Sequence, residues 1–154
     1  MAKKILLFLC NGFEEYEASV FTDVMGWSRE CGLDPVNLVT TALHPKLKGT
    51  WNLIVEPELL FTEVNVDDFD ALAIPGGFEE TGYYVDAYDD RFLDLIRQFE
   101  KQDKPIATIC VGALPVAKSG ILNGRKATTY DLPGSVRQKQ LAAMGALVQP
   151  ERIV

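Results

Sequence analysis

Histidine is nearly absent from this chain, and His44 is the only one among its 154 residues. A histidine-rich metal site is therefore hard to build, and so is a conventional Cys–His catalytic pair. We expect no metal and no organic cofactor, because neither ligand clusters nor a phosphate-binding glycine pattern occurs. His44 lies in the stretch LHPKLKG and is expected in an exposed loop; a catalytic role would need that loop to fold over a reactive cysteine.

Cysteine is scarce as well, and the three that occur are an odd number without metal-ligand spacing. This usage favours a reducing cytoplasm over a disulfide scaffold. We expect Cys10 in the apolar core and Cys31 at a helix end. That leaves Cys110 as the candidate for chemistry, against the ordinary alternative that a free cysteine only fills apolar space.

Long apolar runs and basic clusters are also missing. No run approaches the roughly 20 residues that cross a bilayer, and the apolar start is too short and meets acidic residues too soon for a signal peptide. The net charge of −7, with no gathered basic patch, argues against nucleic acid as a partner. We therefore expect neither a membrane nor a nucleic-acid partner, and one domain over residues 1–154.

What the sequence does contain is an alternation of apolar runs and helical patterns. It predicts strands over 3–10, 35–42, 68–77, 104–110 and 125–130, a short hairpin over 50–64, and a last strand beginning within 146–154. Helices are predicted over 15–31, 90–102, 111–120 and 134–145, with Ala18, Phe21, Val24 and Met25 on one face of the first. Such alternation indicates an α/β fold with a parallel sheet between helices.

Ligands of parallel sheets bind beyond the carboxyl ends of the strands, and three unusual segments fall there. They are NGFEEYE after the first strand, PGGFEE after 68–77, and CVG after 104–110. Cys110 would occupy a tight strand-to-helix turn, the geometry of a nucleophile elbow, where a helix N-terminus favours a thiolate with a lowered pKa. Backbone N–H groups of Gly77 and Val111 could face an oxyanion, and glycine at Gly76 and Gly77 lets the backbone approach closely.

Three glutamates compete for the role of proton donor. Glu14 and Glu15 suit solvated charges in the first turn of a helix. Glu17 lies next to the inward row of Ala18 and Phe21, and burial beside a thiolate would raise the pKa of its carboxyl. We therefore predict that Glu17 lies within hydrogen-bond reach of the Cys110 sulfur.

The segments GFEEYEA, AIPGG and ATICVGALPVAKSGILNGRKATTY together resemble the ThiJ/PfpI-like superfamily, which includes the Parkinsonism-associated deglycase. The resemblance implies a flavodoxin-like three-layer sandwich with a mostly parallel central sheet, and a homodimer. It also implies that Cys110 is the elbow cysteine, that Glu17 hydrogen-bonds it, and that Gly77 and Val111 supply oxyanion-binding amides. Members include deglycases, cofactor-independent glyoxalases, amidases, chaperones and oxidation sensors.

The chain departs from the family pattern in two places. Many members carry a histidine where this chain has Tyr130 and Asp131. A phenol is a weak base near pH 7, so Tyr130 is expected to act only as a hydrogen-bond donor, and Asp131 either orients substrate or caps a turn. The family also continues with a last strand and helix beyond Val154, and their absence would expose a sheet edge and favour an oligomer.

Two functional readings follow. In the first, the chain is a cytoplasmic cysteine enzyme without a Cys–His pair, acting on small carbonyl compounds or their adducts through Cys110 and Glu17. In the second, the same cysteine serves an oxidation-sensing or stress-protective protein. A catalytically silent member that associates through its surface is a third possibility.

Overall fold

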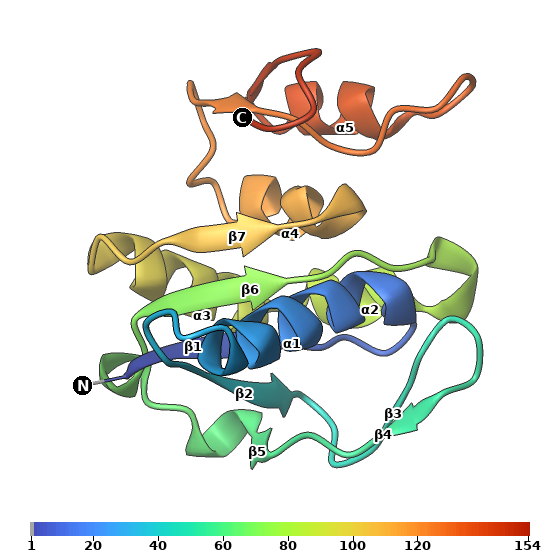
Figure 1. Cartoon of the computed structure of the whole chain (residues 1–154). Coiled ribbons are helices and arrows are strands. Elements are labelled where there is room, and N and C mark those ends of the chain that lie inside the picture. The colour runs from blue at the N-terminus through green and yellow to red at the C-terminus, as the bar shows by residue number, and fades with distance from the viewer. Residues whose placement is uncertain (1) are drawn as a thin grey trace.

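The computed structural model describes residues 2–154 and is shown in Figure 1. The strands are β1 (Lys3–Phe8), β2 (Val36–Ala42), β3 (Leu47–Lys48), β4 (Ile54–Val55), β5 (Leu59–Leu60), β6 (Ala71–Ile74), β7 (Ile106–Thr108), β8 (Lys126–Ala127) and β9 (Leu147–Val148). The α-helices are α1 (Glu15–Glu30), α2 (Tyr83–Ala87), α3 (Asp90–Lys101), α4 (Ala113–Lys118) and α5 (Arg137–Ala143).

Five strands form one parallel sheet in the order β5-β2-β1-β6-β7. Helix α1 covers one face, and α3 lies behind the sheet on the other (Figure 1). The predicted α/β architecture is confirmed: the chain has the flavodoxin-like arrangement of a parallel sheet between helices. Because every strand of this sheet points the same way, the loops that follow β1, β6 and β7 meet at one edge.

The central strand β1 explains why both faces are covered. Its fully buried side chains alternate, so that Leu6 and Phe8 enter the core under α2, α3 and α4, whereas Leu7 enters the core under α1. Phe8 stacks on Phe92 of α3 with ring centroids 3.6 Å apart. Burial of each such side chain stabilises the fold by about 1.5–3 kcal/mol, and a strand that is apolar on both faces suits only the middle of such a sandwich.

Two local predictions were wrong. Residues 50–64 do not form a hairpin by themselves: β4 pairs antiparallel with β3, and β5 joins the main sheet parallel to β2. In α1 only Ala18 and Phe21 are buried, whereas Val24 is 56% exposed. Helical spacing predicts which residues share a face, but the width of the face that the sheet covers depends on the packing.

The C-terminal elements stand apart from the main sheet. β8 pairs parallel with β9 in a separate two-stranded sheet, which Figure 1 shows together with α5 in orange and red. Only Lys126–Ala127 of the strand predicted over 125–130 is extended and paired. Leu141 of α5 is fully buried in the core that also contains α3 and α4, and this contact anchors the unit. Among residues 2–154, no helix is both long and apolar enough to cross a membrane.

Candidate active site

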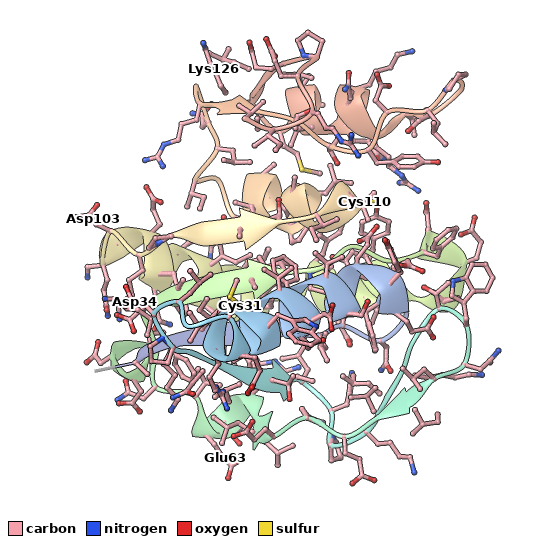
Figure 2. The ribbon with its side chains drawn as sticks, in the orientation of Figure 1. Cys31, Asp34, Glu63, Asp103, Cys110 and Lys126 are labelled. Carbon is pink, nitrogen blue, oxygen red and sulfur yellow. The ribbon has the colours of Figure 1, made fainter. Side chains whose placement is uncertain are left out.

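Cys110 occupies a strained turn at the end of β7. It lies in a 3-10 turn, Cys110–Gly112, between β7 and α4, and its φ of +55° is in the left-handed region. A non-glycine residue in this region costs of order 1–3 kcal/mol and persists where the surroundings enforce it. Figure 2 shows Cys110 beside α4, remote from Cys31 at the end of α1. The predicted sharp turn is therefore present.

The surroundings of Cys110 include a hydrogen bond that holds the turn. The Thr129 hydroxyl, which is buried, donates to the Cys110 carbonyl oxygen at 2.8 Å. Thr129 was not predicted from the sequence, although this residue directly precedes Tyr130, which replaces the histidine found in many members of the family. A hydroxyl two residues beyond β8 thus links the C-terminal unit to the elbow.

Glu17 reaches the same place from the first turn of α1. Its Oε2 accepts a hydrogen bond from the Gly76 N–H at 2.7 Å, and its carboxyl lies close enough to the Cys110 thiol for each group to change the pKa of the other. The carboxyl is thus held between the loop after β6 and the turn after β7. Glu17, rather than Glu14 or Glu15, meets the Cys110 sulfur.

Burial controls the protonation of this pair. It raises the pKa of the Glu17 carboxyl, against the hydrogen bonds from Gly76 and Cys110 that lower it. Burial, followed by the negative charge of Glu17, raises the pKa of the Cys110 thiol to about 12. The lowered thiol pKa expected from the sequence is therefore wrong for this arrangement. The helix after the elbow begins only at Ala113, and the N–H of Val111, which favours the thiolate, does not offset burial and the neighbouring carboxylate.

The glycine loop after β6 is shaped by close contacts. A Cβ on Gly76 would lie 2.8 Å from Glu17 Oε2 and 3.0 Å from the Val111 nitrogen, and a Cβ on Gly77 would collide with the Tyr83 ring and the Gly12 carbonyl. Only glycine fits both positions.

The backbone N–H groups of this loop and of the elbow differ in their hydrogen-bond partners. The Gly76 N–H donates to Glu17 and is therefore not free to bind an oxyanion. The Gly77 N–H has no hydrogen-bond partner among residues 2–154, and the Val111 N–H favours the thiolate of Cys110, which lowers the pKa of that thiol against the larger effect of burial. The role of the Gly77 and Val111 N–H groups as oxyanion donors stays a prediction.

Tyr130 and Asp131 share a pocket with Cys110. Both are exposed, and with Cys110 they line a pocket of about 1070 Å³ between β7 and the C-terminal unit. Glu17, Gly76 and Gly77 are not among its lining residues. Cys110 is thus the candidate site residue that borders both this pocket and the Glu17 carboxyl.

The remaining polar candidates have structural partners. His44 is not a plain loop residue, because its Nε2 lies 2.9 Å from Oδ1 of buried Asp86, whose Oδ2 accepts the Asn11 N–H. Glu14 and Glu15 do not simply face solvent: Glu14 caps α1, and Glu15 accepts N–H groups of the loop between β3 and β4. The sequence carried no signal for the contact of His44 with Asp86, because 42 positions separate them.

The other two cysteines are free thiols, and Cys10 is buried as predicted, whereas Cys31 is exposed at the C-terminus of α1. Within residues 2–154, no group of three or more histidine, cysteine or carboxylate side chains is placed to hold a metal ion.

A model of the DJ-1/PfpI family matches residues 3–154 of this chain. The match includes the elbow cysteine, its glutamate and the glycine loop. The chain belongs to the DJ-1/PfpI family. Its fold agrees, because Drosophila melanogaster DJ-1beta superposes with a TM-score of 0.81 at 25% identity, over 99% of this chain and 76% of that one.

Relatives of this DJ-1/PfpI chain have several names. General stress protein 18 of Bacillus subtilis is 32% identical over 155 residues, covering 100% of this chain and 84% of that protein. Protein DJ-1 homolog D of Arabidopsis thaliana is 31% identical, covering 99% of this chain but 41% of that protein. Deglycase PfpI of Pyrococcus furiosus is 36% identical over 54% of this chain and 49% of that protein. The matches thus span less than half of the plant and archaeal relatives.

Proposed function

We propose that this chain is a cysteine-dependent enzyme that acts on small reactive carbonyl compounds or their adducts, of glyoxalase, deglycase or amidase type, without an added cofactor. The observation that carries the proposal is the contact of Cys110, strained at its elbow, with a Glu17 carboxyl that Gly76 holds in place. Relatives named as deglycases from Pyrococcus furiosus and Pyrococcus abyssi support this reaction class.

The first chemical step uses the proton of the thiol. As the Cys110 sulfur attacks the carbonyl carbon, the S–H proton passes to the Glu17 carboxylate and the C=O electron pair moves to oxygen. The N–H groups of Gly77 and Val111 stabilise that oxyanion. Glu17 then returns the proton to the oxygen, which gives a hemithioacetal and restores the carboxylate.

This route needs no histidine. A carboxyl whose pKa is raised by burial is better matched to accept a proton near neutral pH than an exposed one. The thiol remains protonated until a substrate is in place, because its own pKa is raised as well. Glu17 would thus perform the acid–base work that imidazole performs in Cys–His enzymes.

The proposal is tested by assaying the purified protein with methylglyoxal and glyoxal. The assay measures the loss of the substrate and the formation of the hydroxy acid. We expect Cys110→Ser to abolish turnover and Cys31→Ser, which changes an exposed and remote thiol, to leave it unchanged. Release of carbonyl adducts from glycated amino acids is measured with the same variants. Equal activity of wild type and Cys110→Ser on every carbonyl substrate would overturn the proposal.

An oxidation-sensing or stress-protective role is the second candidate, and the Glu17 contact favours it because a protonated carboxyl can donate to an oxidised sulfur. The raised thiol pKa of Cys110 works against this role because it lowers the thiolate fraction that peroxide attacks. A sensor would therefore have to gain about 32 Da, two oxygen atoms, at Cys110 under limited peroxide despite that pKa. Intact-mass measurement and peptide mapping decide this. Oxidation of Cys31 alone would remove the sensor reading.

We also propose a homodimer that works in the cytoplasm. The large apolar side chains that α1 exposes, Val24 and Trp27, support self-association. The three free thiols, one of them exposed, suit a reducing compartment.

A further inference from the structure

Tyr83 is the largest fully buried side chain in the described structure, and it lies beneath the glycine loop. Its phenol O–H donates to the Pro75 carbonyl oxygen at 2.8 Å. Its ring packs so closely against Gly77 that no side chain fits there. Tyr83 is 0% exposed, and its hydroxyl, the only polar atom of the side chain, is bonded to Pro75, the residue before Gly76. Tyr83 therefore supports the glycine loop from inside the core.

The atom that Tyr83 binds belongs to the same peptide group as the atom that binds Glu17. The Pro75 carbonyl and the Gly76 N–H are the two ends of one planar peptide unit. Tyr83 donates to its oxygen at 2.8 Å, and its N–H donates to Glu17 Oε2 at 2.7 Å. Hydrogen bonds connected in such a chain polarise and strengthen one another inside a protein.

We propose that Tyr83 is a positioning residue of the candidate active site: its hydroxyl orients and polarises the Pro75–Gly76 peptide so that the Gly76 N–H stabilises the charged form of Glu17. Tyr83 acts through the peptide and touches no reacting atom. The effect on turnover rests on the proposed function, whereas the effect on the protonation of Glu17 does not.

The neighbouring Tyr84 provides a matched comparison. Its hydroxyl is buried but has no hydrogen-bond partner among residues 2–154. Its ring packs edge-on to that of Tyr83, with centroids 5.3 Å apart. Removal of an unpartnered buried hydroxyl is close to neutral for stability, whereas removal of the Tyr83 hydroxyl leaves the Pro75 carbonyl without its donor. Tyr83→Phe and Tyr84→Phe thus each remove one buried hydroxyl, but only Tyr83→Phe removes a hydrogen bond to the Pro75–Gly76 peptide.

The test is the titration of the Glu17 carboxyl carbon by NMR, assigned through its loss in Glu17→Gln. The groups that act on this carboxyl are the Cys110 thiol, the Gly76 N–H and the charge of Glu14. In turn, burial and, among nearby charges, that of Glu17 raise the pKa of the Tyr83 phenol. In Tyr83→Phe we expect the Glu17 midpoint to move to higher pH, because the carboxylate loses stabilisation. In Tyr84→Phe we expect the wild-type midpoint. With a substrate that wild type turns over, kcat/KM should fall about three- to tenfold in Tyr83→Phe only.

A second variant keeps the test decisive if Tyr83→Phe fails to fold. Site-specific 3-fluorotyrosine at position 83 retains the hydroxyl and makes it a stronger donor, so the Glu17 midpoint should move to lower pH. Opposite shifts in the two variants support the proposal, as does the fluorotyrosine shift alone. An unchanged Glu17 midpoint in the fluorotyrosine protein, or equal shifts in Tyr83→Phe and Tyr84→Phe, overturns it. Turnover by Cys110→Ser tests the proposed function, whereas the Glu17 titration tests the role of Tyr83. A wrong substrate class would therefore not change the conclusion about Tyr83.

Discussion

The Cys110 thiol lies beside the Glu17 carboxyl at a site where burial raises the pKa of both groups. The negative charge of Glu17 adds to the rise at Cys110, so the two groups titrate as a coupled pair. Near neutral pH the pair retains a proton, in contrast to the free thiolate that a helix N-terminus alone would favour. Reactivity at Cys110 therefore depends on Glu17, and this dependence can be measured.

Glu17→Gln should make Cys110 more reactive toward iodoacetamide near pH 8. The substitution removes the charge that raises the thiol pKa, and each unit by which this pKa falls increases the thiolate fraction about tenfold. Peptide mapping follows Cys110 separately from Cys31. Glu14→Gln should give a smaller increase, because the charge of Glu14 contributes least. Faster alkylation together with lost turnover in Glu17→Gln would identify Glu17 as the base, and an unchanged alkylation rate would refute the electrostatic coupling.

Alkaline pH should destabilise wild type more than Cys110→Ala. The thiol pKa is raised in the folded state, so its contribution to stability is fully present below the unfolded value of about 8.5 and is lost as pH rises toward about 12. The difference in thermal midpoint between the two proteins, measured by calorimetry from pH 7 to 10.5, should change in favour of the variant above pH 8.5. A difference independent of pH would contradict the raised thiol pKa.

Gly76→Ala should damage the site, whereas Gly26→Ala should not. A Cβ on Gly76 meets Glu17 and the Val111 backbone, so we expect a loss of about 1–3 kcal/mol in the free energy of unfolding and a fall in turnover of more than about tenfold. Gly26, inside α1, has nothing within 4 Å of the added atom, and alanine there should stabilise by about 0.5–1 kcal/mol. Urea unfolding and initial rates measure both effects. Equal behaviour of the two variants would count against the close approach at Gly76.

Tyr130→Phe should reduce turnover only modestly, by less than about threefold. The Tyr130 side chain is 41% exposed and lines the pocket beside Cys110, but a phenol is a weak base near pH 7. Steady-state kinetics with the same carbonyl substrates provide the measurement. Complete loss of activity would assign the phenol an essential role and would weaken the assignment of acid–base work to Glu17.

The protein should be a dimer in solution. Helix α1 exposes Val24 and Trp27 at 56% and 59%, an apolar surface that self-association would cover. Light scattering at several concentrations measures the mass, and Trp27→Glu should shift it toward the monomer. Val85→Glu changes an equally apolar, 77% exposed residue on α2 and should leave the dimer intact. A wild-type monomer at high concentration would exclude the dimer.

Local sequence pattern was sufficient for four strands of the main sheet, β1, β2, β6 and β7, but not for β5, which the sequence placed in a hairpin. Doubly buried strands such as β1 need continuous apolar runs, and α3 shows its inward face at helical spacing, because both patterns follow directly from backbone geometry. The elbow at Cys110 and the glycine loop were also predictable, since a strand that ends at a small-residue turn leaves few alternatives.

Protonation and long-range partners were decided only by the tertiary structure. The raised pKa of Cys110 depends on how deeply the elbow is buried and on the distance to a carboxylate 93 positions earlier in the chain, neither of which is a property of local sequence. The same holds for Tyr83 beneath Gly76 and Gly77 and for Thr129 at the Cys110 carbonyl. The sequence by itself determined which groups would reach the sheet edge, whereas packing decided how strongly each holds its proton and which backbone amides remain free.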